Sequence, residues 1–398
     1  MRGLVLFALV LGVFGWWSGW FSSDSLSAAT KTDAPASGRP DEAMRPLGEV
    51  LPPPPTPSGA GQPPQEPLDA NAARPPAPGL DDVLVRLKER TPAAIGDAWA
   101  AVATCRAADK QRLLDAMGKP GDDFPSLLAA LGPHNAFVHS PEGRGVAQQA
   151  IAVVNSMPDA DALDAGTKLL ERMVAGRILQ ADQAARAFVD EALRHHRIRV
   201  DRHLCDPANV TGARSYTIAR GDSLAKIAKK MRAEKLLVEE GMLAILNRIH
   251  NPNTIKVGQK IKIPVAPLHV VVEKRSFAML VYLGDQLIRV YWIGHGENDR
   301  TPVTEFTVDV KQPKPDWTAP DGQVYAYGHP KNILGEYFIR LLHDTYTGFG
   351  IHGTPYPDTI CTMSSHGCIR MYKDDIDEVF RLVPRGAKVV VRATESLR

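Results

Sequence analysis

The fold is decided by Ser364-Ser365-His366-Gly367-Cys368-Ile369-Arg370-Met371, with Ile351-His352-Gly353-Thr354 upstream. A free thiol has a pKa of about 8.5 and is mostly protonated at neutral pH, so a cysteine nucleophile needs a base. It also needs backbone N–H groups that hold the oxyanion formed in acyl transfer. A glycine before the cysteine lets a carbonyl approach those amides. The two stretches therefore predict a cysteine nucleophile with a histidine base.

These motifs resemble the catalytic signature of the L,D-transpeptidases, enzymes that cross-link bacterial peptidoglycan. The resemblance implies that Cys368 is the nucleophile and His352 the general base, oriented by the carbonyl of Gly353. It places His366 behind the catalytic pair or on the substrate side. The implied enzyme is a cysteine acyltransferase that needs no metal and no organic cofactor.

Other positions of the signature are expected to hold the substrate. The amides of Gly367 and Cys368 are expected to form the oxyanion hole, as the resemblance implies. Arg370 and Ser365 are expected to bind substrate, with loop anchoring as the second reading of Arg370. Two other interpretations remain open: a zinc site built from His352, Cys361, His366 and Cys368, and a buried, inert Cys368.

Residues 268–393 are predicted to form a mainly-β catalytic domain. Runs of β-branched and aromatic residues at 269–272, 278–283 and 287–293 predict strands, and Gly284-Asp285 predicts a hairpin turn. The L,D-transpeptidase resemblance extends over this whole segment. It implies that the Cys368 thiolate, paired with His352, attacks a stem-peptide carbonyl, and that an amine of a neighbouring stem then resolves the acyl-enzyme. Water as the acceptor would instead make the protein a carboxypeptidase or endopeptidase.

Residues 215–264 resemble a lysin-motif (LysM) domain, a βααβ fold that binds glycans containing N-acetylglucosamine. The resemblance rests on Tyr216-Thr217-Ile218, Gly221-Asp222-Ser223-Leu224, Asn247 and Val257-Gly258-Gln259-Lys260-Ile261. Either Asp222 or Ser223 is predicted to cap the first helix. The residues expected in the glycan groove are Gly221, Asp222, Ser223 and Asn247.

Residues 81–205 show apolar residues at helical spacing and predict a small α-helical domain with a binding or spacing role. Residues 98–117 show one continuous helical pattern, and residues 124–131 predict a short helix that ends at Gly132-Pro133. Cys105 and Cys205 lie near the two ends of this segment and are candidates for a disulfide, whereas a Cys361–Cys368 bridge would switch activity off.

The N-terminal 80 residues predict a membrane segment followed by a linker. Residues 4–21 are uncharged and nearly long enough to span the roughly 30 Å hydrocarbon layer. Residues 1–22 are therefore expected to be a transmembrane anchor, with a cleaved signal segment as the alternative. Residues 23–80 are rich in proline, which predicts a disordered linker.

The whole chain is thus expected to be a multidomain α+β protein of the cell envelope. It lies outside the cytoplasm in this interpretation, in the periplasm or cell wall, and is held in the inner membrane. Its 47 basic and 45 acidic residues nearly balance, which excludes a nucleic-acid partner. The expected partners are peptidoglycan stem peptides, glycan and the membrane. A wall-binding protein without catalysis is the second interpretation.

Overall fold

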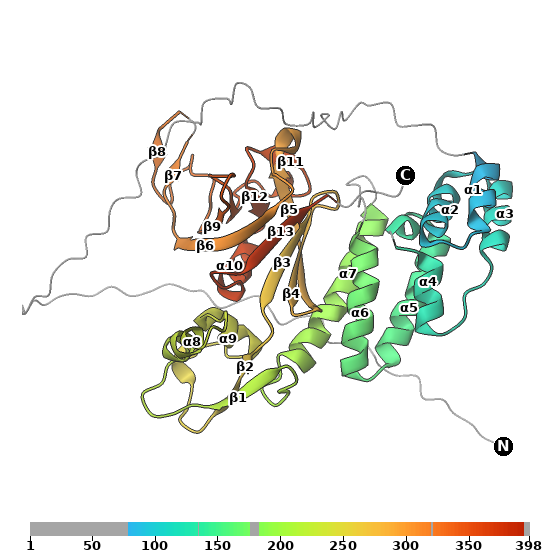
Figure 1. Cartoon of the computed structure of the whole chain (residues 1–398). Helices are drawn as coiled ribbons and strands as arrows, with labels where there is room; N and C mark the ends of the chain where they lie inside the picture. The colour runs from blue at the N-terminus through green and yellow to red at the C-terminus, as the bar shows by residue number, and fades with distance from the viewer. Residues whose placement is uncertain (1–78, 134, 176–182, 320, 394–398) are drawn as a thin grey trace, which may run out of the picture. The chain divides into compact units, whose positions relative to one another are not determined.

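The computed structural model describes residues 79–133, 135–175, 183–319 and 321–393 (Figure 1). The predicted anchor at residues 1–22 and nearly all of the predicted linker at 23–80 lie outside these residues. Within the described ranges, every helix is too short or too polar to cross a bilayer.

The described residues of 80–204 are mainly helical, in keeping with the apolar spacing of their sequence. The side chains of Thr91, Asp123 and Ser140 accept hydrogen bonds from the third residue of α2, α4 and α5, which fixes where these helices begin. The elements are α1 (Leu80–Leu87), α2 (Pro92–Thr104), α3 (Ala107–Met117), α4 (Phe124–Leu131), η1 (Asn135–His139), α5 (Pro141–Ser156), α6 (Asp159–Val174), α7 (Gln183–Arg199) and η2 (Val200–Leu204).

The continuous helical pattern over 98–117 is two helices rather than one. Cys105 and Arg106 both have extended backbones, with ψ of 169° and 155°, so α3 begins anew at Ala107. Thr104 and Cys105 have weak helix propensity, which makes this position the easiest place to interrupt the pattern. The short helix predicted over 124–131 has the same bounds in the structure, because Asp123 caps its start and Gly132 (φ of 71°) ends it.

The helical segment shares its hydrophobic core with the sheet that follows it in sequence. Buried residues of α6 and α7 form one cluster with Val271, Leu280 and Leu287 of the sheet. Polar contacts reinforce this interface: the Tyr282 hydroxyl donates to Glu171 at 2.9 Å. Because this region buries apolar surface against the catalytic sheet, it is a structural support of that sheet and more than a spacer.

Residues 213–264 form a compact βααβ unit. Strands β1 (Ala213–Thr217) and β2 (Lys260–Pro264) pair antiparallel, with Tyr216 opposite Ile261. Between them lie α8 (Leu224–Ala233), α9 (Glu240–Leu246) and the short turn η3 (Pro252–Thr254). Ser223, rather than Asp222, caps α8, since its hydroxyl accepts from the amide of Lys226 at 3.2 Å.

The C-terminal region is a sheet that closes on itself. Its strands are β3 (Leu268–Glu273), β4 (Ala278–Leu283), β5 (Gln286–Gly296), β6 (Glu305–Pro313), β9 (Tyr337–Leu342), β10 (Gly350–Gly353), β11 (Met363–Ser365), β12 (Ile369–Met371) and β13 (Lys388–Arg392). They lie in the order β11-β5-β12-β10-β9-β6-β13-β3-β4, and β4 also pairs with β5. The long β5 achieves this closure because its first part pairs with β4 and its end pairs with β12.

Shorter elements complete this region. They are η4 (Glu297–Asp299), the hairpin of β7 (Trp317–Thr318) and β8 (Val324–Tyr325), η5 (Pro357–Thr359) and α10 (Lys373–Leu382). Helix α10 packs against β9 and β10.

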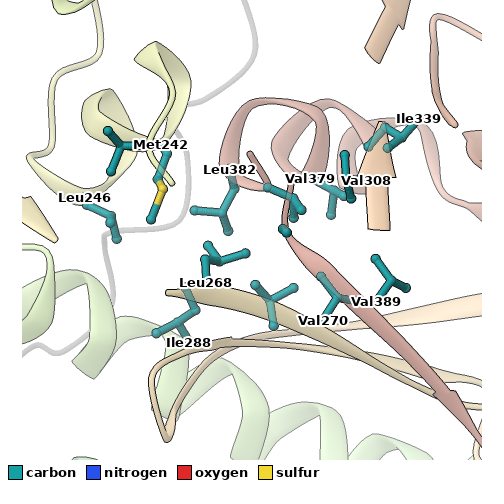
Figure 2. Close-up of a cluster of buried hydrophobic side chains, with 14 of the residues drawn as sticks. Met242, Leu246, Leu268, Val270, Ile288, Val308, Ile339, Val379, Leu382 and Val389 are labelled. Atoms are coloured by element: carbon teal, nitrogen blue, oxygen red, sulfur yellow. The ribbon is translucent and has the colours of Figure 1, made fainter. Parts of the chain in front are cut away.

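The main core lies between the sheet, α10 and α9. Figure 2 draws apolar side chains that meet there from all three, among them Leu268, Val270, Val389, Val379, Leu382, Met242 and Leu246. Helix α9 approaches α10 so closely that a side chain at Gly241 would lie 2.6 Å from the carbonyl oxygen of Arg381. The βααβ unit is therefore packed directly against the region that carries the cysteine motif.

Candidate active site

The two motifs lie on neighbouring parallel strands in the middle of the closed sheet. β10 pairs with β12, with Ile351 opposite Ile369 and His352 opposite Arg370. Side chains alternate between the two faces of a strand, and Ile351 and Ile369 point into the main core. His352 and Arg370 therefore project to the other face, and the Arg370 charge acts on both His352 and Cys368.

His352 is held in one tautomer by its own backbone. Its side chain is only 2% exposed, and Nδ1 lies 2.5 Å from the carbonyl oxygen of Gly353. A carbonyl oxygen can only accept, so Nδ1 carries the proton and Nε2 is left as a base. Burial, with a smaller contribution from the Arg370 charge, lowers the pKa of His352 to about 4. The imidazole is neutral at physiological pH.

Cys368 is a free, partly exposed thiol. Its Sγ lies 3.6 Å from the carbonyl oxygen of Gly348 and accepts a hydrogen bond from the amide of Gly350. Burial of the sulfur raises the pKa of Cys368 to about 11, against smaller opposite effects of the Gly350 amide and the Arg370 charge. The raised pKa of Cys368 and the lowered pKa of His352 both favour the neutral thiol and the neutral imidazole at neutral pH.

Ser365 and Gly367 shape the turn that carries the nucleophile. The buried Ser365 hydroxyl donates to the carbonyl of Cys368 at 2.6 Å and accepts from the amide of Gly367 at 3.1 Å. The Ser365 hydroxyl is thus engaged by its own loop. The Gly367 amide, expected in the oxyanion hole, is occupied by Ser365. Gly367 itself has φ of 136°, and a Cβ there would lie 2.7 Å from the ring of Phe349.

Arg370 and His366 lie on either side of the nucleophile in sequence and differ in burial. The guanidinium of Arg370 is buried and donates to the Ser364 hydroxyl at 3.2 Å, which fits the loop-anchoring interpretation. His366 is exposed. Its position, two residues before Cys368, leaves its ring accessible to a substrate.

The interpretation as a zinc site has no support in the described part of the chain, where no three His, Cys, Asp or Glu side chains converge as metal ligands. Cys361 is buried next to Arg186, and burial raises its pKa. Cys105 and Cys205 are both free thiols, so the suggested disulfide between them is not formed.

Comparison with known proteins finds matches to the two C-terminal regions. A family model of the L,D-transpeptidase catalytic domain (YkuD) matches residues 267–391, and a LysM domain model matches residues 216–264. YqjB of Bacillus subtilis, whose name assigns it to the L,D-transpeptidases, is 32% identical over 126 residues, which are 31% of this chain and 70% of that protein. This chain belongs to the L,D-transpeptidase family.

Further L,D-transpeptidases show the same likeness. YkuD of Bacillus licheniformis is 28% identical over 183 residues, covering 44% of this chain and 97% of the relative. Among solved structures, the catalytic domain of the L,D-transpeptidase from E. faecium is 25% identical and covers 31% of this chain and 95% of that one, with a TM-score of 0.26. An L,D-transpeptidase from Mycobacterium smegmatis is 20% identical, covers 35% of this chain and 65% of that one, and has a TM-score of 0.28.

One predicted groove residue of the LysM domain in this L,D-transpeptidase faces inward. Asn247, expected in the glycan groove, is 3% exposed. Its side-chain amide donates to the carbonyls of Leu243 and Lys262, both at 2.9 Å, and accepts from the Lys262 amide at 2.7 Å. The amide group thereby pairs with the free edge of β2 as another strand would. Asn247 is a structural residue.

The loop after β1 is also tied together internally. Asp222 accepts from the Tyr216 hydroxyl at 2.9 Å and from the Ala219 amide at 2.8 Å. These hydrogen bonds lower the pKa of Asp222. Ser223 caps α8, while Gly221 is exposed with φ of 88°. Of the four predicted groove residues, Gly221 is the most exposed, and its carbonyl accepts from the Lys226 ammonium at 2.8 Å.

Two parts of the L,D-transpeptidase site were missed by sequence analysis. The backbone of Gly348 and Gly350 contacts the Cys368 sulfur, but backbone groups give no signal in residue types. Thr301 donates to the carbonyl of Gly367 at 2.7 Å. Its place in a Thr-Pro pair was visible in the sequence, but its partner lies 66 residues away.

Proposed function

We propose that this chain cross-links peptidoglycan stem peptides through an acyl-enzyme on Cys368, while its LysM domain holds it at the wall. The observation that carries the proposal is the fixed tautomer of His352, which presents Nε2 as a base, while the Arg370 charge acts on both His352 and Cys368. Membership in the L,D-transpeptidase family and the match to a LysM domain support the same function.

In the proposed acylation, the Cys368 thiol gives its proton to Nε2 of His352 as sulfur attacks the carbonyl of the bond between the L-centre and the terminal D-residue. The carbonyl oxygen becomes an oxyanion that the Cys368 amide stabilises. The C–N bond then breaks, and His352 protonates the departing amine of the D-amino acid. A thioester on Cys368 remains.

In the proposed transfer, an amine of a neighbouring stem attacks the thioester and gives its proton to His352. The C–S bond breaks, the cross-link forms, and His352 returns the proton to sulfur. Since both groups rest neutral, each half-reaction begins and ends with the same protonation state. Exposed His366 is positioned to contact the incoming peptide, and Arg370 fixes the loop.

The proposed setting is the cell envelope outside the cytoplasm. LysM binding to glycan and the chemistry of stem peptides both support this location. We further propose that residues 1–22 anchor the chain in the inner membrane, which rests on the uncharged sequence of residues 4–21 alone.

Tetrapeptide muropeptides incubated with the full chain test the proposal, with products identified by mass. Cross-linked dimers and free terminal D-amino acid are expected, and Cys368→Ala is expected to make neither. Tripeptides without dimers would show that the protein is a carboxypeptidase and not a transpeptidase. Turnover by Cys368→Ala would exclude the thiol route. Sedimentation of the inactive Cys368→Ala chain with purified peptidoglycan tests wall binding separately.

A further inference from the structure

Thr301 lies behind the nucleophile turn with both sides of its hydroxyl engaged. The residue is 1% exposed and sits between η4 and β6. Its Oγ accepts from the amide of Gly296 at 2.9 Å and lies 2.7 Å from the carbonyl oxygen of Gly367. An amide can only donate and a carbonyl can only accept, so the hydroxyl proton of Thr301 points at Gly367.

The contact between Thr301 and Gly367 also orients the Cys368 amide, because the two residues share a peptide bond. The bond is planar, and in the trans form its C=O and N–H point in opposite directions. Fixing the Gly367 oxygen therefore fixes the direction of the Cys368 N–H, which points away from Thr301. This N–H is the donor that the proposed acylation needs for its oxyanion.

Ser365 completes the constraint from the other side. Its hydroxyl engages the Gly367 amide and the Cys368 carbonyl, the two groups that flank this peptide bond. Together the hydroxyls of Thr301 and Ser365 bind three of the four polar backbone groups of Gly367 and Cys368. Neither hydroxyl takes the Cys368 N–H, which lies between the groups they hold.

Lys274 fixes Thr301 in turn. The buried Lys274 ammonium donates to the carbonyl of Thr301 and forms an ion pair with Asp299, so it ties down the segment from η4 to Thr301. The segments are also packed backbone to backbone: a Cβ at Gly296 would lie 2.8 Å from the Thr301 nitrogen and 3.0 Å from the Gly367 Cα. The turn has little room to rotate.

We propose that Thr301, held by Lys274, is the positioning residue that aims the Cys368 N–H at the acyl oxyanion. The inference rests on the proposed acyl-enzyme function. It predicts that removing the hydroxyl slows acylation without changing the reactivity of the sulfur. Loss of one oxyanion donor costs about 100- to 1,000-fold in kcat, and misdirection of a donor that remains should cost about 10- to 100-fold.

Two rates separate oxyanion stabilisation from the reactivity of the sulfur. They are the single-turnover acylation of Cys368 by a donor tetrapeptide and its alkylation by iodoacetamide. Alkylation displaces iodide at a saturated carbon and forms no oxyanion. Thr301→Val is expected to slow thioester formation while the alkylation rate of Cys368, followed by peptide mass, stays at the wild-type value. Thr301→Ser restores the hydroxyl and is expected to recover acylation to within a few-fold.

Thr167→Val is the matched control, because the buried Thr167 hydroxyl also accepts from a backbone amide, that of Leu287, in the interface between the helical segment and the sheet. It should leave both rates unchanged. If Thr301→Val does not fold, Lys274→Gln is tested in its place. It too is expected to slow acylation and to leave alkylation unchanged.

Wild-type acylation in the folded variant overturns the inference, as does a parallel fall of acylation and alkylation. Failure of the wild-type chain to form any thioester would instead refute the proposed function.

Discussion

The LysM motif and the cysteine motif use their polar residues in opposite ways. In the LysM domain, the side chains of Asp222, Ser223 and Asn247 all accept hydrogen bonds from backbone amides of the same domain. In the catalytic domain, Ser365 does the same, but Cys368 and His366 keep exposed surface and His352 keeps an unprotonated Nε2.

The difference reflects the size of the two domains. A unit of about 50 residues buries little apolar surface and is only marginally stable by burial alone. Its stability therefore depends more on helix caps and on hydrogen bonds to strand edges. Asn247 illustrates this dependence, because it replaces a missing strand beside β2. The larger catalytic sheet has a core large enough to carry a strained turn and a buried, neutral histidine. Substitutions in the LysM motif should therefore change stability, whereas those in the cysteine motif should change activity.

The largest effect is expected from His352→Ala, which removes the proposed general base. A positioned base contributes about 100- to 10,000-fold, and kcat/KM for acylation should fall by that order. The remaining activity should rise with pH, since hydroxide must then remove the thiol proton. Stopped acylation assays across pH measure both effects. Exposed His366 is the matched control, and an equally large loss in His366→Ala would contradict the assignment of the base.

A titration of the thiol sharpens the same prediction. The ultraviolet absorbance of a thiolate, taken as the difference from Cys368→Ala, should appear only as the pH approaches about 11. Strong absorbance at neutral pH would mean that the pair rests as thiolate and imidazolium.

Asn247→Leu should have the largest effect on the LysM side. It leaves the buried amide and carbonyl of Lys262 without their side-chain partner, at a cost of about 3 kcal/mol or more in local stability. Hydrogen exchange at the Lys262 amide measures this cost. The exposed Asn253 provides the control, and Asn253→Leu should change nothing. If Asn247→Leu has normal stability but no longer sediments with peptidoglycan, Asn247 is a glycan contact.

Acid should destabilise the core that links the helical segment to the sheet. Burial lowers the pKa of His196 to about 4, as it does for His352. The unfolded chain takes up protons near pH 6.5, so the stability present above that pH is lost as the pH falls toward 4. Each histidine accounts for about 3 kcal/mol at most. Thermal melts between pH 7 and 5 should show this loss, and His196→Gln should flatten it. An unchanged slope would refute the role of His196, and exposed His250→Gln is the control.

Ser223→Ala should have the smallest effect. Loss of an N-cap costs about 1 kcal/mol, and helix α8 should fray at its start while catalysis is unchanged. Hydrogen exchange at the Lys226 amide reports the fraying, and sedimentation on peptidoglycan should remain at the wild-type level. Lost binding with normal exchange would make Ser223 a glycan contact.

The sequence by itself determined the candidate catalytic residues and how several elements end. Cys368, His352 and Gly353 could be proposed from residue types and order, because few side chains can act as nucleophile or base. The bounds of α4 were predictable, because Asp123 and Gly132 act on their immediate neighbours. The pattern over 98–117 misled, since the interruption at Cys105 gives only a weak local signal.

Only the tertiary structure decided how those residues are held. It showed that the Gly367 amide is already occupied, that Asn247 faces inward, and that Thr301 reaches Gly367 from 66 residues away. It also shifted the pKa values of Cys368 and His352 toward their neutral forms, since a pKa depends on burial and on surrounding charge. The physical reason is common to all of these: hydrogen-bond partners and solvent exposure are set by contacts between segments far apart in the chain.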